Sequence, residues 1–221
     1  MMQRWLWQIG TSSLMVLTLG SLAHAQAITS AKVVDIPRAP VYWRQPPAAE
    51  IVAEVGTLVT EGGYLRTEKP GKAQLELSNG TAFRLGGDAI LQVSPDLQLN
   101  QGQIIAWTKP HGSGSPPSQS ITTPVATAAI KGSTVFIEMS EAEGRFFSWI
   151  GDVEISLPDG KGSLILKSGE EVVIPSNAQQ LPTPQKMSAQ AIQERLTESE
   201  MINGFNREMD SLPQIKEELL P

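Results

Sequence analysis

The sequence predicts an all-β fold of short strands, arranged as a coiled, solenoid-like or two-sheet β domain, with a short amphipathic helix near the C-terminus. Two observations support it. Between residues 51 and 175, apolar and polar residues alternate in short runs that glycine turns separate. A glycine, a hydroxyl residue and a strand-like run also occur twice, at residues 80–83 and 132–136. The interval of roughly 50 residues lies in the range of structural repeats.

Residues 1–25 are predicted to be a cleaved signal peptide. Arg4 provides the positive charge, an uncharged apolar run follows, and Ala23-His24-Ala25 is a small-x-small cleavage site before Gln26. The alternative is an uncleaved membrane anchor, because residues 5–23 are barely long enough to span a bilayer. We expect cleavage and export, to the periplasm or the outside of a cell with a Gram-negative-type envelope.

Residues 26–50 are predicted to be an irregular, proline-rich lead-in. Val33, Val34 and Ile36 favour a short strand, but the four prolines that follow prevent a long regular element. Within the lead-in, Trp43 is either a platform for a sugar ring or partner, or a side chain that packs against the β domain. Packing is favoured because large aromatic side chains usually supply buried area.

A hairpin is predicted within the β domain, residues 51–175, and its register can be derived. A two-residue turn at Asn79-Gly80 would pair Leu75 with Arg84 and mix apolar with solvent-facing side chains on one face. A three-residue loop pairs Leu75 with Phe83 and keeps the apolar side chains together. We therefore predict a three-residue loop with a left-handed Gly80, or a corner in a coiling sheet.

Residues 131–134 contain the letters of a nucleotide-binding loop in the wrong order. A phosphate-binding loop needs a glycine before the lysine and a helix after it. Here Lys131 precedes Gly132, and the run that follows, Val135 to Ile137, is typical of a strand. The segment is therefore predicted to be two strands that meet at Gly132.

A linker rich in proline and glutamine is predicted at residues 176–187, followed by an amphipathic helix at 188–212 and a tail at 213–221. Ser188 can cap the helix, and Pro213 is expected to end it. The apolar stripe of this helix docks either on the β domain or on a partner, and docking on the β domain is favoured since lone helices are marginal in water. The stripe consists of Ile202, Phe205, Met209 and Leu212.

Composition excludes several classes of function. The chain has no cysteine, which excludes disulfides, thiol catalysis and thiolate metal sites. Its net charge of −6 argues against a nucleic-acid partner, because such a partner requires a basic face.

No catalytic, cofactor-binding or metal-binding residue is predicted. After signal cleavage, His111 is the only histidine, and it lies in a Gly/Ser/Pro loop that cannot hold a general base rigidly. A carboxylate pair for glycoside hydrolysis would have to come from Asp88, Asp96, Asp152 and Glu154. The last two alternate on the outer face of a predicted strand, which indicates a solvated face. Asp159-Gly160 and the sequon at Asn79 are interpreted as turns rather than as calcium or glycan sites.

Several phrases in order resemble the FecR family, named for an iron-dicitrate regulator of Gram-negative envelopes. They are Val55 to Thr57 with Gly63 to Thr67; Ala73 to Leu77 with Asn79 to Thr81; Leu99 with Gly102 and Gln103; Thr123 to Ala126 with Ile130 to Thr134; and Gly151 to Glu154 with Leu166 and Gly169. The lead-in also resembles exported, stand-alone members from cyanobacteria.

The resemblance implies a non-enzymatic, all-β periplasmic module that supports envelope signalling by protein contact. Too few residues precede the apolar run to hold a sigma factor, and no receptor-docking domain follows residue 175, so iron-citrate signalling is not expected. We therefore predict an exported signalling accessory or scaffold with a protein partner. The alternative is a glycan- or peptidoglycan-binding module that uses Trp43, Trp107 or Trp149.

Overall fold

The computed structural model describes residues 29–108 and 115–220. The predicted signal peptide and His111 lie outside the described residues. The strands are β1 (Ser30–Arg38), β2 (Val41–Arg44), β3 (Ile51–Val52), β4 (Leu58–Thr60), β5 (Tyr64–Thr67), β6 (Lys72–Leu77), β7 (Ala82–Gln92), β8 (Leu97–Trp107), β9 (Ser118–Thr122), β10 (Thr127–Lys131), β11 (Thr134–Met139), β12 (Glu143–Ile150), β13 (Val153–Ser156), β14 (Ser163–Leu166), β15 (Glu170–Pro175) and β16 (Gln185–Lys186).

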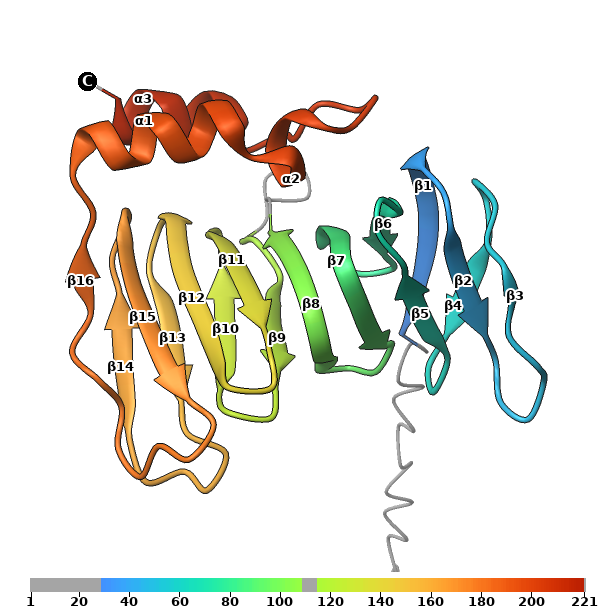
Figure 1. Cartoon of the computed structure of the whole chain (residues 1–221), viewed down its shortest axis with the longest axis horizontal. Coiled ribbons are helices and arrows are strands. Elements are labelled where there is room, and N and C mark those ends of the chain that lie inside the picture. The colour runs from blue at the N-terminus through green and yellow to red at the C-terminus, as the bar shows by residue number, and fades with distance from the viewer. Residues whose placement is uncertain (1–28, 109–114, 221) are drawn as a thin grey trace, which may run out of the picture.

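The strands form one 16-stranded open sheet that folds back on itself, so that two layers face each other (Figure 1). Strands β8, β11, β12 and β15 form one layer of the C-terminal half, and β9, β10, β13 and β14 form the other. In the N-terminal half, β7 pairs with both β5 and β6, from which β5-β2-β3 and β6-β1-β4 extend. The described pairs are antiparallel except β8 with β9. The predicted all-β class with C-terminal helical structure is confirmed.

The predicted register of the β6–β7 hairpin is confirmed. Leu75 pairs with Phe83 and Ala73 pairs with Leu85, so the apolar side chains share one face. The loop closes through the backbone N–H of Leu77, which donates to the carbonyl of Thr81 at 2.8 Å. Gly80 has a φ of +87°, as the three-residue loop requires.

Gly132 lies between β10 and β11, which belong to different layers. Its φ of +70° allows the backbone to turn from one layer into the other. The predicted strand–glycine–strand corner is therefore present. The two similar glycine segments have different structural roles. Gly80 closes a hairpin, whereas Gly132 connects two strands that do not pair with each other.

The expectation of an irregular lead-in was wrong. Strand β1 extends over nine residues and pairs with both β4 and β6, and β2 pairs with β3 and β5. Pro37 is tolerated in β1 because the pairing with β6 shifts register between Asp35 and Arg38, where no ladder hydrogen bond from a proline is needed. The β domain therefore includes residues before 51.

The expected single helix at 188–212 is divided into α1 (Ala189–Glu198), α2 (Glu200–Asn203) and α3 (Leu212–Leu219). Ser188 caps α1, as predicted, by accepting a hydrogen bond from the Ala191 N–H at 3.2 Å. Pro213 does not end a helix. It lies in the first turn of α3, where the missing N–H has no helical partner to lose. None of the helices that the structure describes has the length and apolarity to cross a membrane.

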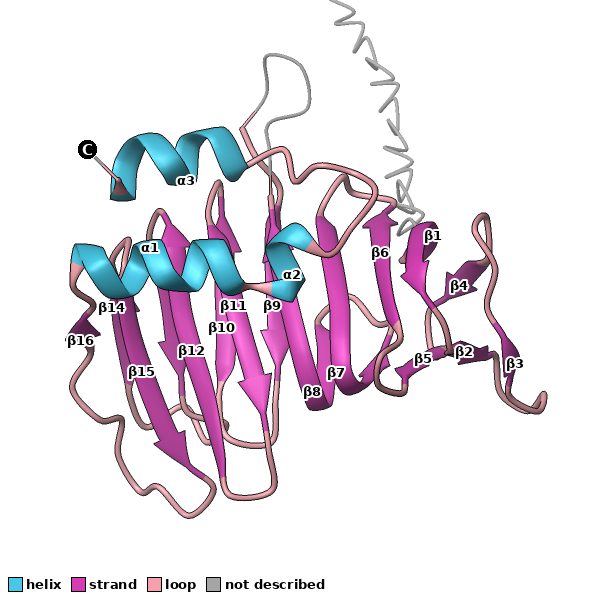
Figure 2. Ribbon diagram, turned by 45° about the horizontal axis from the view of Figure 1, so that its top comes forward, coloured by secondary structure: helices cyan, strands magenta, loops and turns pink. Residues whose placement is uncertain are grey.

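Two apolar clusters hold the molecule together. The larger lies between the two layers and takes residues from β1 through β15. The smaller lies between the helices and the outer face of β8 and β12, where α1 and α3 cover the sheet (Figure 2). Residues 104–107 of β8 are therefore buried on both faces. The helical segment docks on the β domain, the outcome that the sequence favoured.

Candidate protein-binding surface

The three tryptophans proposed for a glycan site are engaged within the fold. Trp107 and Trp149 are 1% exposed and lie under the helices. Trp43 is half-buried and packs against the larger core, as its packing interpretation expected. Stacking on a sugar needs an exposed ring face, so the described residues offer no tryptophan platform of that kind.

The carboxylates considered for catalysis are dispersed over the fold. Asp88 lies in a bulge of β7, where the pairing with β8 shifts between Gly86 and Ile90. Asp152 forms an exposed ion pair with Lys167 at 3.0 Å, and Glu154 is exposed on β13. Asp159 accepts a hydrogen bond from the Lys161 N–H in a turn. Within residues 29–108 and 115–220, no group of three or more His, Cys, Asp or Glu side chains could hold a metal ion.

Arg84 is a structural residue that the sequence analysis placed on the solvent-facing side of its strand. Its side chain is fully buried and reaches the C-terminal segment. The guanidinium donates to the carbonyls of Met201 at 3.0 Å, Ile202 at 2.7 Å and Arg207 at 2.5 Å. It also lies 4.2 Å from the ring centre of Phe205. Burial lowers the pKa of Arg84 to about 10, so the group is still protonated at neutral pH.

Asp35 completes this anchor from β1. Its carboxylate accepts hydrogen bonds from the Asn206 backbone N–H at 2.9 Å and from the Asn206 side-chain amide at 3.0 Å. The backbone N–H of Arg207 donates to the same carboxylate at 3.3 Å. Arg84 thus binds backbone carbonyls and Asp35 binds backbone N–H groups between residues 201 and 207, and together they fix α2 and the start of its connection to α3.

The outer face of β3, β2, β5 and β7 carries paired tyrosine and arginine side chains. Tyr42 lies opposite Arg66, and Arg44 lies opposite Tyr64, on neighbouring strands. In both pairs the guanidinium carbon is 4.5 Å from the ring centre. Val52 of β3 pairs with Tyr42, and Ile90 of β7 pairs with Arg66, so both lie on the same face as this tyrosine and arginine. We call this set the Tyr–Arg face.

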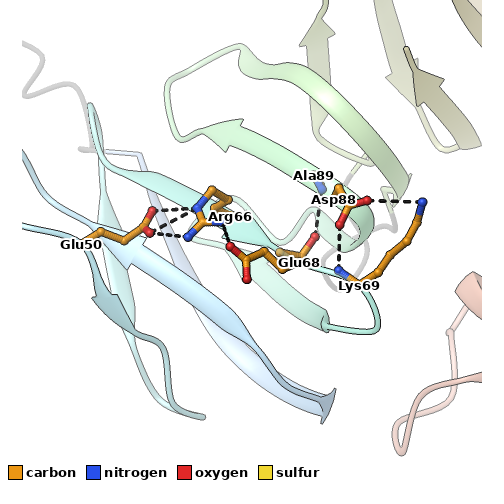
Figure 3. A network of polar contacts seen from close by, with 7 residues as sticks. Glu50, Arg66, Glu68, Lys69, Asp88 and Ala89 are labelled. Carbon is orange, nitrogen blue, oxygen red and sulfur yellow. Dashed lines mark hydrogen bonds and ion pairs between the residues drawn. The ribbon is translucent and has the colours of Figure 1, made fainter. Parts of the chain in front are cut away.

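An ion-pair network fixes this face (Figure 3). Arg66 binds Glu50 through two nitrogens, the closer contact being 2.6 Å, and also contacts Glu68. The hydrogen bond from Arg66 lowers the pKa of Glu50, and the two carboxylates raise the pKa of Arg66. Arg66 is therefore held in place over Tyr42 by Glu50 and Glu68. Nearby, the Lys69 backbone N–H donates to Asp88 at 2.7 Å, which lowers the pKa of that carboxyl.

The strands next to the Tyr–Arg face, β3 and β4, lie at one end of the molecule (Figure 1). Residues 51–60, which we call the edge segment, first pair with β2 and then with β1. The segment has no further strand on its outer side among the described residues. Four of its large apolar side chains are more than half exposed: Ile51, Val52, Val55 and Leu58.

The middle of the chain is similar to a known protein family. Residues 63–154, from the residue before β5 into β13, match the FecR protein family. This chain carries a FecR domain. The resemblance inferred from the ordered sequence phrases is confirmed, and the FecR match includes Tyr64, Arg66 and Ile90 of the Tyr–Arg face. The remaining residues of the face and the edge segment precede the matched region.

Solved structures resemble the FecR-domain chain only distantly. Two crystal structures of a candidate anti-sigma factor from Parabacteroides distasonis ATCC 8503 are 12% identical to it, with TM-scores of 0.46 and 0.49. The matches cover 57% and 61% of this chain and 61% and 64% of the other, so they span less than two thirds of that protein. At this similarity neither structure bears on what this chain binds. No protein of curated function is similar enough in sequence to count as a relative.

Proposed function

We propose that this FecR-domain protein is exported to the cell envelope, where it supports signalling by binding another protein and not by catalysis. The FecR family is regulatory and faces the periplasm, which supports this assignment. The observation that carries the proposal is the Tyr–Arg face, a rigid and partly exposed surface with no structural partner in the described chain.

The chemistry of the Tyr–Arg face suits a protein partner. Tyrosine and arginine are enriched among the residues that dominate binding energy at protein interfaces. Tyr42 and Tyr64 are each already covered on one side by a guanidinium, and Arg66 is held by two carboxylates. Little side-chain entropy remains to be lost when a partner binds, so the face is organised in advance.

A photo-crosslinking experiment tests this function. A photoreactive phenylalanine replaces Tyr42 in the full chain, which is expressed in its native cells. The matched control carries the same residue at Glu217, an exposed position on α3. We expect an adduct with a second envelope protein from position 42 and none from position 217. The proposal fails if position 42 gives no adduct, or if both positions capture the same proteins.

Export is tested separately by fractionation and intact-mass measurement. We expect the mature chain in the periplasmic or extracellular fraction, with Gln26 as its first residue. Recovery of the uncleaved chain in the cytosol would contradict the export part of the proposal. That outcome would not change the result of the crosslinking test, which examines protein binding separately.

A further inference from the structure

We propose that the methionines that dock the C-terminal helices on the sheet are sites of reversible oxidation, and that their sulfoxides hold the helices away from the sheet. The proposal concerns residues 187–220, which we call the helical cover, and not the Tyr–Arg face. The helical cover closes the outer face of β8 and β12 (Figure 2). Because the chain has no cysteine, methionine thioethers are its oxidisable sulfur groups.

Methionine is concentrated in the helical cover. Of the seven methionines in the sequence, three belong to the predicted signal peptide. Among the other four, Met187, Met201 and Met209 lie in the helical cover and pack in the smaller apolar cluster, whereas Met139 of β11 packs in the larger one. An unbranched thioether adapts well to an irregular apolar surface, but oxidation converts it into a polar group that disrupts such a contact.

The three methionines of the helical cover differ in how easily an oxidant reaches them. Met187 is half-buried and lines a cleft of about 560 Å³ between α1 and the outer face of β11 and β12. Met201 is 4% exposed and Met209 is 1% exposed. Met187 is therefore open to a small oxidant in the docked state, whereas Met201 and Met209 react when the cover opens locally.

Unpaired polar atoms beneath the helical cover favour such opening. Within residues 29–108 and 115–220, the buried indole nitrogens of Trp107 and Trp149 and the buried hydroxyl of Ser211 have no hydrogen-bond partner. Trp107 and Trp149 lie under the helices, and Ser211 immediately precedes α3. A buried donor without a partner costs free energy that is recovered in water. Opening the cover returns these groups to water, so it costs less than opening the larger core.

The chemical step transfers one oxygen atom from a hydroperoxide, such as hydrogen peroxide. The methionine sulfur donates an electron pair to one peroxide oxygen, an S–O bond forms and the O–O bond breaks. The proton on the transferred oxygen passes to the other oxygen, which leaves as water. The sulfur is oxidised by two electrons and the peroxide is reduced by two. Sulfoxide reductases restore the thioether with electrons from a dithiol, so the change is reversible.

The sulfoxides do not fit the docked state. The Met201 sulfur lies against the backbone of β7, since a Cβ added to Gly86 would be 2.8 Å from it. Met209 is buried among apolar side chains of the smaller cluster. A sulfoxide oxygen accepts hydrogen bonds, and burial among apolar groups without a donor is unfavourable. Oxidation during an opening event therefore keeps the helical cover from docking again until the sulfur is reduced.

Peroxide treatment of the mature protein tests the proposal. Mass spectrometry of proteolytic fragments follows each methionine, and tryptophan emission is recorded on the same samples. We expect Met187 to be oxidised first, Met201 and Met209 next, and Met139 at least about tenfold more slowly than these two, because the larger core opens less often. Emission should move to longer wavelengths as Met201 and Met209 are oxidised, and sulfoxide reductases should reverse the change.

Substitution by leucine identifies the sulfur atoms responsible. A triple variant with Met187→Leu, Met201→Leu and Met209→Leu keeps nearly the same apolar volume, so it should fold, which circular dichroism checks, and its emission should not respond to peroxide. Met139→Leu is the matched control and should respond as the unmodified protein does.

Four outcomes would overturn the proposal. Met201 and Met209 stay reduced after Met187 is oxidised; they are oxidised without a change in emission; Met139 is oxidised as fast as they are; or the triple variant still responds. None of these results would alter the crosslinking expected from Tyr42.

Discussion

Arg84 and Asp35 hold the C-terminal segment mostly through its backbone groups, with added contacts to the side chains of Asn206 and Phe205. A guanidinium has five N–H donors in a fixed planar arrangement, and here it meets three carbonyls and the Gln74 side chain. A lysine has a single ammonium on a flexible stem and cannot reproduce this geometry.

The first prediction is that Arg84→Lys lowers the free energy of unfolding by about 1–3 kcal/mol, because buried carbonyls lose their donors. Urea denaturation measures the change. Arg44→Lys is the matched control, since Arg44 is exposed, and it should change the value by less than about 0.5 kcal/mol. Equal effects from the two substitutions would contradict the role assigned to Arg84.

The second prediction concerns two glycines with the same positive φ. Gly62 and Gly102 both have a φ of +82°. A Cβ on Gly62 would meet no atom within 4 Å, whereas a Cβ on Gly102 would lie 2.3 Å from the Cα of Ala89. Gly62→Ala should therefore cost about 1 kcal/mol from the left-handed backbone alone. Gly102→Ala should cost at least about 3 kcal/mol, because the bulge of β7 must also move. Thermal unfolding of both variants checks the difference, and similar losses would refute the close approach.

At the scale of elements, α1, α2 and α3 complete the sheet rather than form a separate unit. Short helices are marginal in water, so these depend on the apolar face that they cover. That face is formed by Ile105 and Trp107 of β8 with Phe147 and Trp149 of β12. Phe147 and Trp149 meet edge to face, with ring centres 4.7 Å apart. The same strands bury their other side in the larger core.

The third prediction is that Leu196→Asp detaches the helices, since Leu196 is 5% exposed within the smaller cluster. Detachment exposes Trp107 and Trp149 to water, so tryptophan emission should move to longer wavelengths while the far-ultraviolet β signal remains. Limited proteolysis should then cut within residues 188–220. Gln193→Asp adds the same charge on the exposed side of α1 and should leave the spectrum unchanged. If emission does not change in Leu196→Asp, the helices contribute little to burying the tryptophans.

At the scale of the whole molecule, carboxylates in separate parts of the chain bind donors that hold their pKa values below the ordinary range. The donors are the Arg66 side chain for Glu50, the Lys69 backbone for Asp88, the Lys161 backbone for Asp159 and the Lys72 side chain for Glu200. In each case the folded pKa is lower than the unfolded pKa, so the unfolded chain binds more protons in the interval between them. Stability therefore rises with pH across that interval.

The fourth prediction is a loss of stability in acid. The stabilisation is fully present above the unfolded pKa values of about 4 and is lost as pH falls through the folded values. Asp88→Asn should reduce this acid dependence, since asparagine accepts the same hydrogen bond and tolerates the φ of +62° at this position. Urea unfolding between about pH 2 and 7 measures both profiles. An unchanged slope in Asp88→Asn would show that the Asp88 charge does not contribute.

The sequence by itself determined the local features of this protein. Alternating apolar residues predicted the strands, the pairing of Leu75 with Phe83 followed from keeping one face apolar, and Gly132 marked a corner because no other residue turns so readily. The ordered segments by themselves resemble the FecR family, and the family match covers residues 63–154. These features depend on residues that are close together in the chain, where spacing alone is informative.

Only the tertiary structure decided which surfaces are covered. Arg84 has the spacing of a solvent-facing residue, yet it is buried because the segment around residues 201–207 returns to cover it. The proline-rich lead-in forms strands because β1 pairs with β6 and β2 pairs with β5. Pro213, which was expected to end a helix, lies in the first turn of α3. Whether a polar side of a strand meets water or another element depends on contacts between distant parts of the chain, and a periodic pattern carries no information about them.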